Sequence, residues 1–386
     1  MMKIKLMEDS FTEEEIIAVN NCLKSGNYTQ GELVEEFEKK FAEWNSSKYG
    51  VMVNSGSSAN LLMISILKEK FGLKDGDEIL VPSVTWPTTV YPIIQNNLVP
   101  VFCDVDESFN ISLDSIKKMK TNKTKAIFVV HLLGQPAKIQ EIKKFCEDNN
   151  LILIEDCCES LGAKCNEIKV GNFGIMSSFS FYFGHHITTI EGGMILTNEL
   201  EIWDILRSMR SHGWVRKSLR LGKYYLFENN DFLFDMLGYN LRSTDVNAAI
   251  GLVQLKKLDN IIKKRVDNHR YFLNKISALG IECQKVNLEE TSSFSLAVLF
   301  RDKSERDYIL RELNNQNIEC RPIVAGNLLR QPVFSKGAMK ADFTIPMADK
   351  IHYLGLYLPN NQFIDQEKVD YMIEKISELM KGKNGY

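Results

Sequence analysis

Two adjacent histidines, His185 and His186, follow a stretch whose pattern predicts a half-buried strand. At residues 178–183 small polar and aromatic residues alternate, which is typical of a strand with one buried face. Gly184 breaks the pattern, so both imidazoles are expected at the end of this strand. An imidazole with its ordinary pKa of about 6.5 can accept or release a proton near neutral pH. A purely structural histidine pair is the alternative that these residues alone leave open.

Carboxylates follow a second predicted strand, at residues 151–155. Asp156 ends this strand, and Glu159 comes one helical turn later. An unpaired buried carboxylate is costly, so a carboxylate at this position is expected to have a cationic partner. The alternative is that Asp156 caps the next helix.

A run of small residues, 54–60, connects a predicted strand at residues 49–53 to a long apolar helix. Such a turn offers backbone N–H groups and the positive end of a helix to a phosphate group. Gly56 and Ser57 are the candidate contacts, although a tight strand-to-helix turn needs small residues even without a ligand. Trp86 follows a further predicted strand at residues 78–82.

Short apolar strands alternate with helices through the first half of the chain, which indicates a mainly parallel sheet covered on both faces. The other predicted strands are 100–103, 126–130 and 194–197, and the predicted helices are 13–24, 32–44, 113–120 and 139–149. Ligands of such sheets bind beyond the carboxyl ends of the strands. We therefore expect Ser57, Trp86, Asp156 and His185 to meet at one edge of the sheet.

The alternation of strands and helices changes near residue 243. Ser243 or Thr244 can cap a helix that is predicted to run to Leu255, and a cationic stretch follows it to Arg270. Strands are predicted at 293–300 and 317–322, and a closing helix at 364–380. These elements predict a large α/β domain at residues 1–250 and a smaller α/β domain at residues 251–386.

The composition is that of a soluble globular protein, with 386 residues, 44% hydrophobic and 25% charged. A net charge of -3 gives no reason to expect nucleic acid or an anionic membrane as a partner. No apolar run is long enough to span a bilayer, and the N-terminus lacks the apolar stretch of a signal peptide. The eight cysteines contain no Cys-x-x-Cys, so we expect reduced thiols, no metal site and a cytoplasmic protein.

The stretch from Ser178 to Gly193 resembles the cofactor-lysine segment of the DegT/DnrJ/EryC1/StrS sugar aminotransferases, which use pyridoxal phosphate. Aligning Glu-Gly-Gly at 191–193 places the family's lysine position at His185, and no lysine occurs between Lys169 and Lys217. A lysine would form a Schiff base with the cofactor, and an imidazole cannot. The His-His-Ile-x-Thr-x-Glu-Gly-Gly form is similar to the sugar-nucleotide 3-dehydratases of this superfamily. The resemblance therefore implies a non-covalently bound cofactor and a catalytic base at His185.

The resemblance also implies roles for the other candidates. Asp156 would pair with the protonated pyridine nitrogen of pyridoxal phosphate and Glu159 would lie near its 3-hydroxyl. Trp86 would stack on its ring, and Ser180 would contact its phosphate. The five residues at 238–242 resemble the family's Gly-x-Asn-x-Arg segment, whose Asn reaches the partner's cofactor phosphate. Asn240 thus implies a homodimer with shared active sites.

Arg242 and Arg321 are candidates for binding the phosphates or carboxylates of the substrate, with surface ion pairs as the alternative. Other members that carry the histidine hold an iron–sulfur cluster on cysteines downstream of it. No cysteine occurs between Cys165 and Cys283, so we expect no cluster.

The fold that the resemblance implies is that of aspartate aminotransferase (fold type I), with the N-terminal helix packed against the small domain. The implied reaction starts from pyridoxamine phosphate and a nucleotide-linked 4-keto-6-deoxy sugar, with GDP as the expected nucleotide. His185 would take a proton from the C4′ carbon of the cofactor, the C3 hydroxyl would leave, and L-glutamate would restore the amine with release of 2-oxoglutarate. A sugar 4-aminotransferase and a non-catalytic binding protein are the alternatives, and the sequence does not separate a hexose from a heptose substrate.

Overall fold

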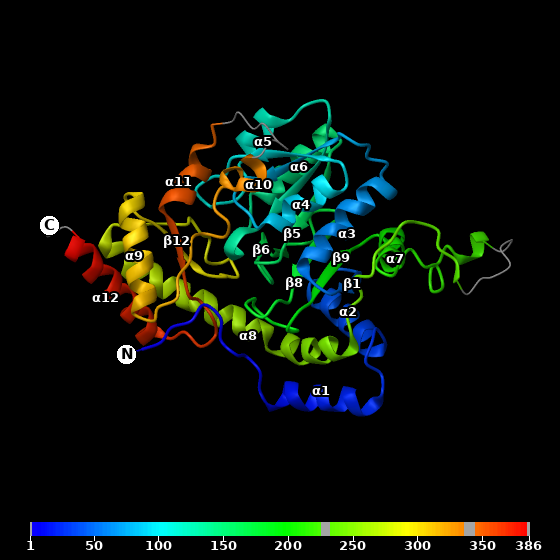
Figure 1. Ribbon diagram of the computed structural model, residues 1–386, viewed down its shortest axis with the longest axis horizontal. Helices are drawn as coiled ribbons and strands as arrows, with labels where there is room; N and C mark the ends of the chain where they lie inside the picture. Colours follow the sequence, from blue (N-terminus) through cyan, green and yellow to red (C-terminus); the bar gives the residue numbers. More distant parts are fainter. Residues whose placement is uncertain (1, 225–231, 336–343, 384–386) are drawn as a thin grey trace.

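A seven-stranded sheet forms the centre of the computed structural model, which describes residues 2–224, 232–335 and 344–383 (Figure 1). The strand order is β1-β9-β8-β5-β4-β2-β3. The five strands from β8 to β3 are parallel to their neighbours, whereas β9 runs antiparallel to both β8 and β1. The strands are β1 (Tyr49–Val53), β2 (Glu78–Pro82), β3 (Val99–Cys103), β4 (Thr124–Val130), β5 (Ile152–Asp156), β8 (Met176–Ser180) and β9 (Gly193–Thr197).

Helices cover both faces of this sheet, because alternate strand residues are apolar on both sides. In β5, for example, Leu153 and Ile154 enter different cores on opposite faces. One face packs against α3 (Gly56–Glu69), α4 (Pro87–Gln95) and α7 (Leu200–Met209). The other packs against α2 (Glu32–Trp44), α5 (Leu113–Met119), α6 (Ile139–Asn149) and part of α8 (Asp245–Ile276). The predicted α/β architecture is therefore confirmed.

The helix α8 is longer than the sequence pattern predicted. Thr244 caps it through the backbone N–H of Asn247, and it continues for 32 residues to Ile276 without a break. The prediction that the helix ends at Leu255 was wrong, because the cationic stretch keeps an apolar stripe, with Leu258, Ile261 and Phe272 buried at helical spacing. The helix crosses residue 250, so the division of the chain into two domains at that point stays a prediction.

The C-terminal part has its own small antiparallel sheet, of order β10-β11-β12, packed against helices. Its strands are β10 (Glu282–Cys283), β11 (Leu296–Leu299) and β12 (Gly355–Leu358), and its helices are α9 (Lys303–Asn315), α11 (Pro346–Leu354) and α12 (Gln366–Lys383). The strand predicted at 317–322 was wrong: only isolated bridges form there, Ile318 to Ile4 and Arg321 to Tyr357. Ile4 is also buried in the core of this C-terminal part.

The first helix, α1 (Glu13–Ser25), begins with the predicted capping box of Thr12 and Glu15 and lies along α8 (Figure 1). Its buried Glu15 accepts hydrogen bonds from Gln254 and Lys257 of α8. Among the described residues, none of the helices combines the length and the apolar character that crossing a bilayer demands.

Candidate active site

A cavity of about 530 Å³ lies beyond the carboxyl ends of the parallel strands. Eight of the ten site residues predicted from the sequence line it: Gly56, Ser57, Trp86, Asp156, Glu159, Ser180, His185 and Arg321. The other two, Asn240 and Arg242, do not line it. The four residues expected to meet at one edge of the sheet, Ser57, Trp86, Asp156 and His185, thus lie around one cavity, and their roles there stay predictions.

The N-terminus of α3 opens into this cavity. Ser55 caps the helix by accepting the N–H of Ser58, which leaves the N–H groups of Gly56 and Ser57 without a partner among the described residues. Gly56 lies against Ser180, since a Cβ on this glycine would be 2.7 Å from the Ser180 Cβ. Two free N–H donors and the nearby Ser180 hydroxyl make a cradle suited to a phosphate group.

Asp156, at the end of β5, is held rigidly on the floor of the cavity. Its Oδ2 accepts hydrogen bonds from Asn60 Nδ2 at 2.8 Å and from Thr89 Oγ1 at 2.9 Å, and its Oδ1 accepts the N–H of Cys158 at 3.1 Å. Asn60 is oriented in turn by Ser178, which donates to its Oδ1. These contacts fix the carboxylate, and no local sequence pattern indicates that Asn60 and Thr89 would support it.

Glu159 lines the cavity beside Asp156, and its Oε2 accepts the backbone N–H of Leu133 at 2.9 Å. Burial raises the pKa of the Glu159 carboxyl to about 7, and the Asp156 carboxylate acts in the same direction. Near neutral pH this side chain therefore exists in both protonation states, so that it can donate or accept a hydrogen bond.

The loop after β8 separates the two histidines. The predicted strand at 178–183 ends at Ser180, and the residues beyond it turn so that His185 lines the cavity while His186 is buried. Nε2 of His186 contacts the carbonyl oxygen of Ser292 at 3.0 Å, as expected of a structural histidine. Nδ1 of His185 has no hydrogen-bond partner among the described residues. Of the two histidines, only His185 is thus placed for proton transfer in the cavity.

Arg265 of α8 supports the histidine loop, a role that the sequence did not signal. Its guanidinium is buried and donates to the carbonyl oxygens of Phe294, Asn360 and His185. Burial lowers the pKa of His185 to about 4, and the positive charge of Arg265 adds to this effect. The imidazole is therefore neutral near pH 7 and able to accept a proton.

The outer wall of the cavity carries the remaining predicted residues. Trp86, at the start of α4, is 56% exposed, so its ring is available for stacking. Arg321 pairs through its backbone with Tyr357 of β12. Burial and the nearby Glu159 raise the pKa of the Tyr357 hydroxyl, which lines the same cavity. This tyrosine was missed from the sequence because β12 was not predicted.

Asn240 and Arg242 lie together on the segment that precedes α8. Nε of Arg242 donates to Oδ1 of Asn240 at 3.1 Å, and Arg242 forms an isolated bridge with Val53 at the end of β1. Neither residue lines the cavity of its own chain, so the roles expected of Asn240 toward a second copy and of Arg242 toward the substrate stay predictions.

A second group of titratable side chains, His131, Glu155 and Cys157, is buried beneath the cavity with ligand atoms within 4.8 Å of one another. Glu155 already accepts three backbone N–H groups, from Gly171, Phe173 and Gly174, and its Oε2 lies 3.1 Å from His131 Nε2. The other ring nitrogen of His131 accepts the N–H of Ala137. These hydrogen bonds satisfy the carboxylate and the imidazole, so the group is explained as structural support for β5.

The cavity fits pyridoxal phosphate on three observations. The free N–H groups of Gly56 and Ser57 offer donors to a phosphate, and the close approach of Gly56 to Ser180 leaves no room for a side chain there. The fixed carboxylate of Asp156 can pair with a protonated pyridine nitrogen. The described residues that line the cavity include no lysine, so none of them can form a Schiff base with the cofactor.

Comparison with known proteins agrees with this geometry. The model of the DegT/DnrJ/EryC1/StrS aminotransferase family matches residues 9–377. GDP-4-keto-6-deoxy-D-mannose 3-dehydratase of Escherichia coli O55:H7 is 39% identical, over 97% of this chain and 99% of that protein. GDP-perosamine synthase of Escherichia coli O157:H7 is 32% identical, over 99% of this chain and 100% of that protein.

Among solved structures, one of GDP-4-keto-6-deoxymannose-3-dehydratase with a trapped PLP-glutamate geminal diamine superimposes with a TM-score of 0.91 at 39% identity. The superposition covers 97% of this chain and 100% of that chain. Fold and sequence agree over nearly the whole length, so this chain belongs to the DegT/DnrJ/EryC1/StrS aminotransferase family.

Proposed function

We propose that this protein is a pyridoxal phosphate-dependent 3-dehydratase that acts on a GDP-linked 4-keto-6-deoxy sugar. One observation carries the proposal: a neutral, partly buried imidazole lies in a cavity whose described lining contains no lysine. The chain is 39% identical to a GDP-4-keto-6-deoxy-D-mannose 3-dehydratase over nearly its whole length. The substrate is GDP-4-keto-6-deoxy-D-mannose or a related heptose, and the product is a 3,6-dideoxy-4-keto sugar.

Five residues of the cavity have tasks in the proposed reaction that follow from their positions. When bound, the cofactor supplies an amine that joins a ketone and a ring that withdraws electrons. Asp156 would keep the ring nitrogen of the bound cofactor protonated, and Gly56, Ser57 and Ser180 would hold its phosphate group. The imidazole of His185 accepts a proton at a ring nitrogen and returns it as the C3 hydroxyl of the substrate leaves as water.

Two alternative functions, a sugar 4-aminotransferase and a non-catalytic binding protein, differ from a dehydratase in their chemistry. A sugar 4-aminotransferase is the first rival, since the family to which the chain belongs is named for aminotransferases. It is disfavoured because no described lysine reaches the cavity. A non-catalytic binding protein is disfavoured because Asp156, Asn60 and Thr89 keep a fixed carboxylate that such a protein would not need.

A homodimer and a reducing, cytoplasmic compartment belong to the same proposal. Between α7 and α8, the described residues 210–224 and 232–244 extend away from the sheet (Figure 1). Apolar side chains are exposed there, including Phe232, Phe234 and Leu237. Such a surface favours contact with a second copy, whose cofactor phosphate Asn240 would reach. All eight cysteines are free thiols, which favours a reducing compartment.

Turnover tests the proposal directly. Purified protein is incubated with pyridoxal phosphate, L-glutamate and either the hexose or the heptose form of a GDP-linked 4-keto-6-deoxy sugar, and mass spectrometry identifies the products. A product lighter by loss of the C3 hydroxyl, with ammonia and 2-oxoglutarate released, supports a dehydratase. A 4-amino sugar that keeps its C3 hydroxyl would establish the aminotransferase instead, and the absence of cofactor binding would favour the non-catalytic protein.

A further inference from the structure

Arg265 of α8 is a buried arginine without a carboxylate partner in the described part of the chain. Two other described arginines are buried, and each pairs with a carboxylate: Arg210 with Glu38 and Arg306 with Asp307. Arg265 is only 3% exposed and donates to backbone carbonyl oxygens alone. Burial lowers the pKa of its guanidinium to about 9, so it still carries a positive charge near pH 7. A buried charge without a counter-ion is costly, which packing alone does not explain.

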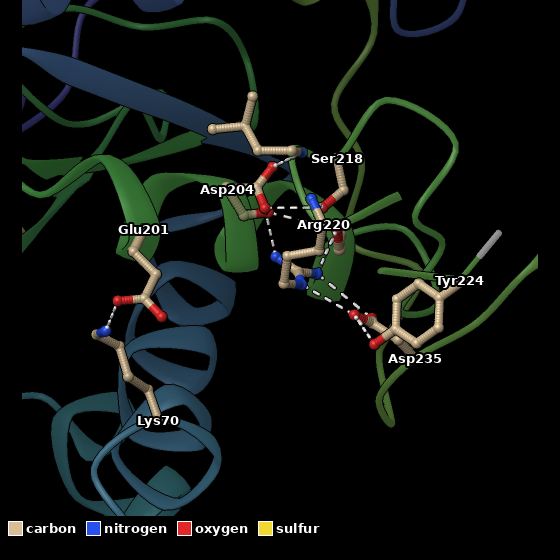
Figure 2. Close-up of polar contacts among 9 residues, drawn as sticks. Lys70, Glu201, Asp204, Ser218, Arg220, Tyr224 and Asp235 are labelled. Carbon is tan, nitrogen blue, oxygen red and sulfur yellow. Dashed lines mark hydrogen bonds and ion pairs between the residues drawn. The ribbon is translucent and has the colours of Figure 1, made fainter. Parts of the chain in front are cut away.

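A less buried arginine shows how this protein otherwise joins segments. Figure 2 shows Arg220 between Asp204 of α7 and Asp235, at distances of 2.5 Å and 2.8 Å. Arg220 thus links two segments through carboxylates that neutralise it. Arg265 also links separate segments, but its positive charge remains.

The three carbonyl oxygens that Arg265 binds belong to three different segments. Its Nη1 donates to Phe294 at 2.9 Å and to Asn360 at 2.5 Å, and its Nη2 donates to His185 at 3.4 Å. Phe294 lies between β10 and β11, Asn360 follows β12, and His185 belongs to the loop after β8. One guanidinium group therefore joins the histidine loop of the central sheet to two segments of the C-terminal part.

The ring of Phe294 forms a second connection between Arg265 and the imidazole. Its centroid lies 5.3 Å from that of the His185 ring and 6.0 Å from the guanidinium carbon of Arg265. Asn360 fixes the same cluster from the other direction, since its Nδ2 donates to the carbonyl oxygen of Arg265 at 3.0 Å. The imidazole is thus held both through its own backbone and through a ring that Arg265 contacts.

Several elements place charged or titratable groups around His185. Arg265 faces it from α8, and Tyr182 and His186 lie on its own loop. His186 is neutral, because burial lowers its pKa well below the ordinary value. The N-terminal segment and the loop before β11 contribute only uncharged residues to the cavity. The charged and titratable groups that share the cavity are Asp156, Glu159, Glu191, Arg321 and Tyr357. Of all these groups, Arg265 is the charge that, together with burial, lowers the pKa of His185.

We propose that Arg265 is a positioning residue for His185, which holds the histidine loop against the C-terminal part and places an uncompensated positive charge next to the imidazole. Its effect on turnover rests on the proposed function. When His185 accepts a proton, the imidazolium faces a like charge, so the proton passes on to the C3 hydroxyl, which leaves as water. Arg265 thus favours release of the proton without touching the substrate.

Two variants separate the contacts of Arg265 from its charge. Arg265→Lys keeps the charge but lacks the planar fork that reaches three carbonyl oxygens. We expect its kcat to fall about tenfold or more, with KM within about twofold of the wild type, because the base is misplaced while binding is kept. Arg265→Gln removes the charge. The acidic fall of its kcat/KM should move up by about one pH unit, since burial, the larger cause of the lowered pKa, remains.

The matched control is Arg306→Lys, which changes a buried arginine of α9 that donates to the carbonyl oxygen of Tyr353. Arg306 does not line the cavity, so this variant should lose stability while kcat per folded molecule and the pH profile stay unchanged. The comparison separates a role toward His185 from the general cost of altering a buried arginine.

Nuclear magnetic resonance of histidine-labelled apoprotein measures the effect on the imidazole without turnover. The chain has six histidines, and the His185 signal is the one missing from His185→Asn. At pH 5 about 10% of this imidazole should be protonated in the wild type and about half in Arg265→Gln, for pKa values of about 4 and one unit higher. A failed dehydratase assay would leave this result intact.

Two results would overturn the proposal. One is wild-type kcat per folded molecule in Arg265→Lys, and the other is unchanged protonation of His185 in folded Arg265→Gln. A loss of thermal stability without either expected change would make Arg265 a structural residue only. If Arg265→Gln does not fold, Arg265→Lys decides through the ratio of its kcat to that of the Arg306→Lys control.

Discussion

Replacement of His185 by asparagine tests whether this histidine is catalytic or structural. The pKa of about 4 means that only ~0.1% of the imidazole is protonated at pH 7, so nearly every molecule has a base available. Asparagine remains polar but cannot accept the proton. We expect turnover to fall by ~10²–10⁴-fold, the usual contribution of a positioned base, which corresponds to about 3–5 kcal/mol of transition-state stabilisation.

Cofactor binding should survive this change, because the contacts of Asp156 with Asn60 and Thr89 do not involve His185. Spectroscopic titration with pyridoxal phosphate measures that binding, and ammonia release from the GDP-linked substrate measures turnover. The pH profile adds an independent check. In the wild type, the acidic fall of kcat/KM due to His185 should occur near pH 4 rather than near 6.5, since protonation removes the base only below its lowered pKa.

The matched control is His186→Asn, which removes a buried imidazole that contacts the carbonyl oxygen of Ser292. We expect this variant to lose about 1–3 kcal/mol of folding stability while turnover per folded molecule stays within about tenfold of the wild type. The opposite pattern, with near-normal turnover in His185→Asn and none in folded His186→Asn, would refute the assignment.

Three further predictions follow from the cavity. Burial raises the pKa of Glu159 from 4.5 to about 7, so its contribution to stability is complete below about pH 4.5 and is lost as pH rises through 7. Glu159→Gln should therefore gain thermal stability over the wild-type apoprotein at pH 8 but not at pH 4, and equal differences at both would contradict the shift. Gly56→Ala should weaken pyridoxal phosphate binding about tenfold or more by pushing Ser180 away, and unchanged affinity would argue against the cradle. Borohydride treatment of the loaded protein should leave its intact mass unchanged, whereas an adduct on any lysine would overturn non-covalent binding.

The central sheet could be predicted closely because its strands are short apolar runs bounded by turn residues. The predicted strands at 49–53 and 78–82 agree with β1 and β2 at both ends. The errors in the strand prediction lie where tertiary contacts determine whether a segment forms a strand. The stretch 317–322 has an apolar pattern but forms only isolated bridges, and β12 was missed because its pairing with β11 is not visible in local sequence.

The residues of the candidate site likewise fall into those that could be placed from the sequence and those that could not. Residues that directly follow a strand, such as Asp156 and Ser57, could be placed because the topology of a parallel sheet gathers strand ends. Arg265 of α8 supports the histidine loop and Tyr357 of β12 lines the cavity, both from far along the chain, through packing that no local pattern encodes. The lowered pKa of His185 likewise depends on burial and on a distant guanidinium, so it could not be inferred from the histidine pair.

The bridge between Ile4 and the C-terminal part has a consequence for synthesis on the ribosome. Ile4 exchanges backbone hydrogen bonds with Asn317 and Glu319, and Leu6 donates its N–H to Glu319, a partner 313 residues away. At 5–20 residues per second, roughly 15–60 s pass between the emergence of these two segments. During that interval the segment around Ile4 is synthesised but its partner is not, so its apolar side chains stay exposed to solvent or to a chaperone. They become buried only when the core of the C-terminal part forms.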